Sequence, residues 1–163
     1  MIRDHQHQSG FTLIELVVVI FILAIIAATV GLNIAKDPTS EVREEAERLA
    51  ILLNVAKDQA ILEGRFYGVR IDENGYEFTR LNQTGELETV VDDSLLRRRK
   101  FSEDINLADF VVDGKSVDTN DGGFLITPVG QYPAFVVSLS HFDHRWQVLS
   151  TDEGQIGTGS PDA

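Results

Sequence analysis

The sequence has 163 residues and a formal net charge of -12, from 26 acidic and 14 basic side chains, and it contains no cysteine. This length suffices for one domain of ordinary size. The acidic excess repels phosphate backbones and anionic lipid surfaces, which argues against nucleic acid as a partner. The lack of cysteine excludes disulfides, thiolate metal sites and cysteine nucleophiles.

A long apolar segment follows ten polar residues at the N-terminus. It begins at Phe11 and reads FTLIELVVVIFILAIIAATVGL, with Glu15 as its one charged residue. A helix of this length can cross a hydrocarbon core of about 30 Å, and in lipid a helix satisfies its own backbone. We therefore predict a membrane helix over residues 11–36, with the leader 1–10 in the cytoplasm and the acidic remainder on the far side.

Glu15 decides between four interpretations of this segment: a secretory signal peptide, a plain signal anchor, a buried core helix, and a membrane helix whose carboxylate has a function. A secretory signal peptide would have a shorter apolar core before a small-residue cleavage site, which Ala24, Ala27 and Ala28 could imitate. A signal anchor explains the length but not the carboxylate, and a buried core helix would be longer and more apolar than a domain of this size needs. Acidic side chains in membrane helices are costly and are usually paired or functional. Cleavage after residue 10 would free an amine about one helical turn away, which could neutralise Glu15 within one chain or between chains.

A break and a second helix are predicted after the apolar segment. Pro38 cannot donate to a helical ladder and disfavours helix at Asp37, and Thr39 or Ser40 can cap a new start. Apolar residues then recur at spacings of four and three, which predicts an amphipathic helix over about 41–63 that packs on a sheet. The stripe consists of Val42, Ala46, Leu49, Leu53, Ala56 and Ala60.

Strands are predicted for the rest of the chain. Gly64 is the expected C-cap of the second helix, and Asn74-Gly75 between two apolar runs is a strong hairpin signal. The expected strands are 66–71, 76–81, 90–91, 107–112, 124–127, 134–140 and 145–150, with 155–156 as a further edge. The fold class is therefore α+β: a long N-terminal helix, half membrane-embedded and half amphipathic, packed on an antiparallel sheet or on two packed sheets.

The processing motif carries a family resemblance. Gly10-Phe11-Thr12-Leu13-Ile14-Glu15, followed by the apolar run, resembles the processing site of type IV pilin-like proteins. The resemblance implies that a prepilin peptidase cuts between Gly10 and Phe11 and N-methylates Phe11. It also implies that Glu15, at the fifth mature position, helps to recruit and align the subunit in a filament.

The remaining sequence resembles one branch of this family. Segments 44–49, 56–65, 75–78 and 124–130 are similar to those of H-type minor pseudopilins of type II secretion, and to related minor pilins of type IV pili. The resemblance implies a non-enzymatic subunit without a cofactor, which links the tip complex to the shaft of a pseudopilus during export of folded proteins across the outer membrane. The implied partners are other minor and major pseudopilins, the prepilin peptidase and the inner-membrane assembly platform. A type IV pilus minor pilin, acting in pilus assembly or DNA uptake, is the alternative.

The resemblance also gives an expected organisation. A leader (1–10) is removed, and a single span (11–36) anchors the chain in the inner membrane. The amphipathic helix (37–64) and a β-rich domain (65–156) lie in the periplasm, where the subunit joins the pseudopilus. Residues 157–163 are small and polar and are expected to form a flexible tail.

Three further clusters are candidate sites. His141 and His144 have the spacing of a metal-binding pair, but no third strong ligand is nearby and no hydrolase motif is present, which favours a polar hairpin loop. The basic run 97–100 is interpreted as a solvated or locally paired loop, with a protein or phosphate contact as the alternative. The acidic stretch 118–121 could bind calcium, but lacks the spacing of an EF-hand loop. We therefore predict no catalytic and no metal-binding residues.

Overall fold

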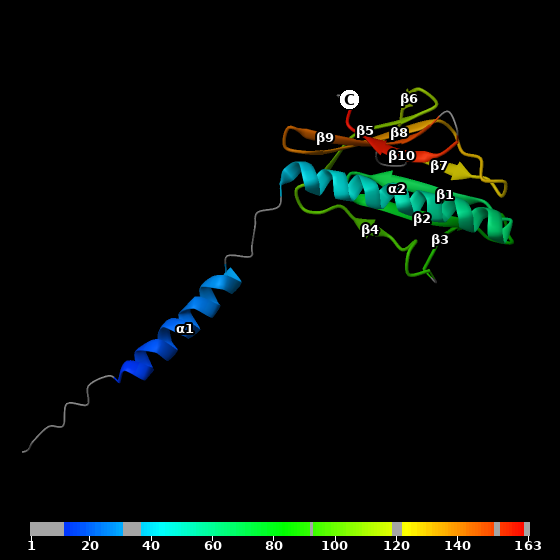
Figure 1. The fold of residues 1–163 in the computed structure, drawn as a ribbon. Helices are drawn as coiled ribbons and strands as arrows, with labels where there is room; N and C mark the ends of the chain where they lie inside the picture. Colours follow the sequence, from blue (N-terminus) through cyan, green and yellow to red (C-terminus); the bar gives the residue numbers. More distant parts are fainter. Residues whose placement is uncertain (1–11, 31–36, 92, 119–121, 152–153, 162–163) are drawn as a thin grey trace, which may run out of the picture. The chain divides into compact units, whose positions relative to one another are not determined.

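The structure, a computed structural model, describes residues 12–30, 37–91, 93–118, 122–151 and 154–161 (Figure 1). The chain divides into two compact units, Met1–Lys36 and Asp37–Ala163. The first contains helix α1 (Leu13–Val30), and the second contains helix α2 (Pro38–Glu63) together with all the strands that the structure describes.

Helix α2 is closed by a cap at each end. Asp37 is the N-cap, and its side chain accepts a hydrogen bond from the backbone N–H of Thr39 at 3.2 Å. Gly64 is the C-cap with φ 64°, as predicted, and its N–H donates to the carbonyl of Ala60. The prediction that Thr39 or Ser40 caps the helix was wrong. Pro38 occupies the first helical position, where its missing N–H costs no hydrogen bond, so the helix starts earlier.

The first sheet has the strand order β3-β2-β1-β7, with β4 also paired to β2. Its strands are β1 (Tyr67–Asp72), β2 (Gly75–Leu81), β3 (Leu87–Thr89), β4 (Arg99–Lys100) and β7 (Gly123–Ile126). The predicted hairpin is confirmed: Asp72 pairs with Gly75, and the N–H of Asn74 donates to the Asp72 side chain at 2.7 Å.

The second sheet has the order β10-β9-β8-β5-β6, and every pairing in both sheets is antiparallel. Its strands are β5 (Asn106–Val112), β6 (Lys115–Ser116), β8 (Phe135–His141), β9 (His144–Ser150) and β10 (Ile156–Gly159). The α+β class is therefore confirmed, in the form with two sheets.

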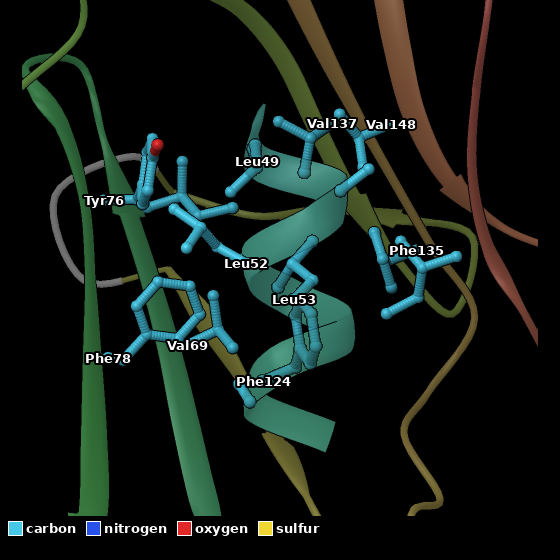
Figure 2. Close-up of a cluster of buried hydrophobic side chains, with 14 of the residues drawn as sticks. Leu49, Leu52, Leu53, Val69, Tyr76, Phe78, Phe124, Phe135, Val137 and Val148 are labelled. Atoms are coloured by element: carbon cyan, nitrogen blue, oxygen red, sulfur yellow. The ribbon is translucent and has the colours of Figure 1, made fainter. Parts of the chain in front are cut away.

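The core lies where α2 meets both sheets (Figure 2). Side chains of the first sheet contact one flank of the helix and side chains of the second sheet contact the other, with Leu53 between them. Phe124 and Phe135 stack across the two sheets with ring centroids 4.6 Å apart. All members of the predicted apolar stripe are fully buried, namely Val42, Ala46, Leu49, Leu53, Ala56 and Ala60.

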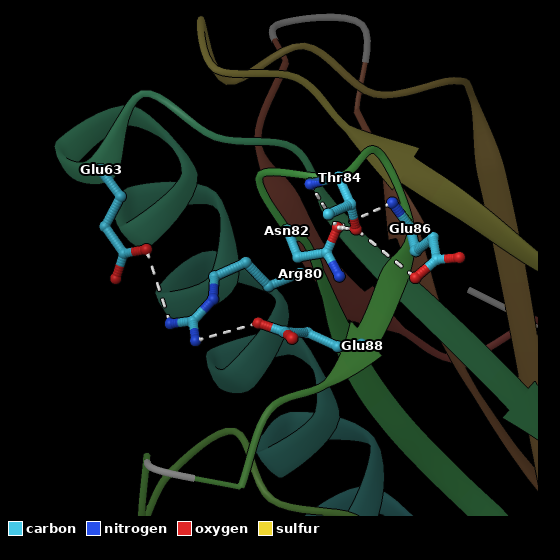
Figure 3. A network of polar contacts seen from close by, with 6 residues as sticks. All are labelled: Glu63, Arg80, Asn82, Thr84, Glu86 and Glu88. Atoms are coloured by element: carbon cyan, nitrogen blue, oxygen red, sulfur yellow. Dashed lines mark hydrogen bonds and ion pairs between the residues drawn. The ribbon is translucent and has the colours of Figure 1, made fainter.

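The turn between β2 and β3 explains one wrong strand prediction. The Asn82 side chain accepts hydrogen bonds from the N–H groups of Thr84 and Glu86, at 3.0 and 2.9 Å (Figure 3). This compact turn brings Leu87 opposite Leu81, so the strand is 87–89 and not the predicted 90–91. Arg80 of β2 links this sheet to α2. Its guanidinium lies 3.8 Å from the Glu63 carboxylate of α2 and 3.5 Å from the Glu88 carboxylate of β3 (Figure 3).

Two further differences concern short edge segments. The two-residue strands β4 and β6 were not predicted, because a ladder of this length shows no periodicity. Residues 157–159, which were expected to belong to a flexible tail, instead pair with β9 as part of β10.

A buried carboxylate lies between α2 and the first sheet. Glu45 is only 2% exposed, and it forms an ion pair with Arg48 one turn further along the helix. The Tyr76 hydroxyl donates to the same carboxylate at 3.5 Å. Burial raises the pKa of Tyr76 above its ordinary value, although the Arg48 and Arg99 guanidinium groups act in the opposite direction.

Replacing Arg48 by methionine should therefore leave the Glu45 charge buried without its cation. We expect the free energy of unfolding to fall by about 2–3 kcal/mol, less than for a fully buried pair because the Arg48 side chain is 45% exposed. The double variant Glu45→Met, Arg48→Met should recover most of the loss. Urea denaturation of the three proteins measures this, and equal losses in the single and double variants would contradict it.

Candidate assembly site

The start of α1 holds the residues to which the sequence assigned assembly. Thr12 precedes the helix, and its carbonyl accepts hydrogen bonds from the N–H groups of Glu15 and Leu16 at 3.1 and 3.2 Å. Its hydroxyl oxygen also accepts from the Glu15 N–H at 3.4 Å. Glu15 thus lies in the first turn, where the positive end of the helix dipole favours a carboxylate. Gly10 and Phe11 lie outside the residues that the structure describes.

Thr12 belongs to the candidate site, although the sequence did not single it out. Thr-x-x-Glu at a helix start is the capping-box pattern, so the signal was present in the sequence. The Thr12 hydroxyl caps the first turn by accepting the hydrogen bond from the Glu15 backbone N–H.

The described part of α1 has apolar side chains on every face. Between residues 13 and 25 the large apolar side chains are 45–81% exposed within the chain, and Glu15 is exposed among them. A helix that is apolar all round requires an apolar environment, either lipid or other helices. Among the described residues, no helix meets the length and hydropathy of a membrane span. The predicted span, 11–36, begins and ends outside these residues.

The two histidines contact α2 separately. The His141 Nδ1 lies 3.3 Å from the Glu41 carboxylate, an ion-pair distance without hydrogen-bond geometry, and the His144 Nδ1 lies 3.0 Å from the Thr39 hydroxyl. Within the described ranges, no group of three or more acidic or histidine side chains is arranged to hold a metal ion. Residues 119–121 of the weighed calcium stretch lie outside those ranges.

The basic run 97–100 is paired within the domain. Arg98 contacts the Asp72 carboxylate at 3.3 Å, and the Arg99 guanidinium donates to the Leu95 carbonyl at 3.2 Å. Arg99 and Lys100 also form β4, which pairs with the start of β2. These contacts agree with the interpretation of a locally paired segment.

Comparison with known proteins gives a motif match at the N-terminus and two relatives by sequence. Residues 5–31 match the prokaryotic N-terminal methylation motif. Type II secretion system protein H of Pseudomonas aeruginosa is 41% identical over 77 residues, which are 47% of this chain and 45% of that protein, so the match spans less than half of that relative. The protein of the same name from Aeromonas hydrophila is 26% identical over 91% of this chain and 89% of its own length.

Solved structures share the fold. The minor pseudopilin EpsH of the type 2 secretion system of Vibrio cholerae has a TM-score of 0.63 at 22% identity, covering 76% of this chain and 99% of that one. The solution structure of GspH from E. coli has a TM-score of 0.59 at 16% identity, covering 77% and 93%. The methylation motif, the sequence matches and the shared fold together make the chain similar to H-type minor pseudopilins.

Proposed function

We propose that the chain is a minor subunit of the type II secretion pseudopilus, and that it links the tip complex to the shaft during export of folded proteins. The observation that carries this proposal is the combination, in one chain, of the methylation motif at 5–31 with the fold of H-type minor pseudopilins. The relatives found by comparison favour type II secretion over the type IV pilus alternative. The role is structural and involves no catalysis.

The proposed life cycle begins at the inner membrane. The segment 11–36 anchors the precursor there, and the domain beyond it lies in the periplasm. Prepilin peptidase cuts between Gly10 and Phe11 and methylates the new N-terminus. The assembly platform then moves the subunit from lipid into the filament, where neighbouring apolar helices replace lipid around α1.

Glu15 supplies the specificity of this transfer. A carboxylate in a low-dielectric environment is costly without a partner, and the Phe11 amine of an adjacent subunit is a cation at nearly the same depth. Pairing the two removes both penalties and sets the axial position of one helix against the next. Thr12 contributes by holding the first turn, from which Glu15 projects.

The proposal is tested by co-purification of the domain from Asp37 onward with candidate partners. This unit has its own core between α2 and two sheets, so it should fold without α1. We expect it to bind the other minor pseudopilins and the major one. Binding only to minor pilins of type IV pili would move the function to pili.

A Gly10→Val substitution should leave the leader attached to the chain. The proposed peptidase site accepts little bulk before the cut, so the purified variant should keep the mass of the unprocessed and unmethylated precursor. Ser9→Ala, one residue further from the cut, is the matched control and should be processed. Intact-mass spectrometry of membrane extracts measures both, and a mature mass for Gly10→Val would contradict the assignment.

A further inference from the structure

The turn between β8 and β9 has an unusual residue at its tip. His141 pairs with His144, so Phe142 and Asp143 form a two-residue turn. Phe142 has φ 52°, which is rare for a bulky side chain, and turns of this kind favour glycine at the first central position. Its side chain is 77% exposed. A glycine would remove both the backbone strain and the exposed apolar surface.

The turn is held firmly against the first turn of α2. The flanking His141 is buried beside Glu41, and His144 contacts Thr39 at 3.0 Å. The Phe142 ring lies against the His141 ring, with centroids 4.6 Å apart and planes 27° apart. Figure 1 shows the β8–β9 turn beside the start of α2. The aromatic ring therefore projects from a fixed support, as an interface anchor does.

The position of the tip indicates which surface it meets. Asp37 begins the domain, so the tip lies at the end of the domain where the chain enters from the first unit. Under the proposed function the chain leaves this end of the domain toward the filament, where we expect the apolar N-terminal helices of neighbouring subunits. Helix α1 shows the chemistry of such a helix, with exposed apolar side chains on every face. The carboxylates at positions 37, 41 and 143 repel anionic lipid headgroups, and Arg145 offsets part of this charge. The tip is therefore better suited to an apolar helix than to an anionic lipid surface.

We propose that Phe142 is an anchor that packs against the apolar N-terminal helix of an adjacent pilin-like subunit. This inference deepens the proposed function and rests on it. A rigid aromatic side chain gains a large apolar contact on such a helix with little loss of conformational freedom. The contact compensates for the strain that the isolated domain carries at this residue.

A photo-crosslinking amino acid in place of Phe142 tests the contact directly. The full-length chain carrying p-benzoylphenylalanine is expressed with a complete type II secretion system and irradiated in cells. We expect an adduct with another pilin-like subunit, mapped by mass spectrometry to its apolar helix. The same probe at Val129, which is 73% exposed, is the control and should give no such adduct. Adducts with lipid alone, adducts with soluble domains alone, or no adduct would overturn the inference.

The Phe142→Gly variant separates anchoring from folding. Its isolated domain should melt about 3–5 °C higher, because the strain is removed. In cells it should reduce secretion several-fold, whereas Val129→Ser should not. A lower melting temperature, or normal secretion by the variant, would contradict the anchor. If cells carrying Phe142→Gly secrete normally while cells carrying Glu15→Val do not, the anchor inference is wrong and the proposed function stands. If cells carrying Glu15→Val also secrete normally, the pairing role proposed for Glu15 is wrong as well.

Discussion

Replacing Leu53 by alanine should lower the free energy of unfolding of the domain by about 3–5 kcal/mol. Leu53 is completely buried at the centre of α2, between side chains of both sheets (Figure 2). The cost of such a substitution is the lost transfer free energy plus that of the cavity left behind. Here the cavity is bounded by two sheets and a helix, which cannot close on it together. The expected loss therefore lies in the upper part of the usual range.

Urea denaturation of the domain from Asp37 onward measures this loss. The matched control is Leu62→Ala on the same helix, where the side chain is 79% exposed and the change should stay within about 0.5 kcal/mol. Domains of this kind have a total stability of about 5–15 kcal/mol, so a large part of it depends on Leu53. Equal effects of the two substitutions would mean that α2 is not the element shared by both sheets.

The parts of the fold that the sequence predicted are those set by local periodicity. The apolar stripe of α2 and the Asn74-Gly75 hairpin need only neighbouring residues to be recognised, and both are confirmed. Strand β4 could not be predicted, because its pairing depends on a contact between distant residues. At Gly75, an added Cβ would collide with the Arg99 carbonyl, so the missing side chain is what admits β4.

Phe142 was overlooked for a different physical reason. A hairpin of this length is normally signalled by glycine or asparagine at its tip, and Phe142-Asp143 offers no such signal. The loop was predicted, but its strain was not, because strain appears only once the register of β8 and β9 is known. A residue that breaks a local rule in this way is where a function outside the fold is to be sought.

The candidate site at α1 was predicted from the chemistry of its residues and not from the fold. One carboxylate in an apolar helix needs a partner, and the sequence alone pointed to Glu15. The structure adds the Thr12 contacts that fix its first turn. Cleavage between Gly10 and Phe11 and the pairing with the freed amine stay predictions, because those two residues lie outside the described ranges.

Glu15→Val should abolish most incorporation of the subunit while leaving it processed and bound to the membrane. Valine removes the penalty that the carboxylate suffers in lipid, so the variant is at least as stable in the membrane as the parent. In the filament, however, the neighbouring Phe11 amine is left without its anion in a low-dielectric environment. If the lost pairing is worth about 2–3 kcal/mol, the incorporated fraction should fall by roughly 30- to 150-fold.

The measurement is the ratio of incorporated to membrane-bound subunit, from sheared filaments and membranes of the same cells. Ile22→Val, on the same helix and still apolar, is the matched control and should incorporate normally. Glu15→Gln separates charge from hydrogen bonding, because it keeps the shape and the polar contacts but not the anion. A defect in Glu15→Gln close to that of Glu15→Val would assign the effect to charge, whereas normal assembly and secretion by Glu15→Val would exclude the pairing for this subunit.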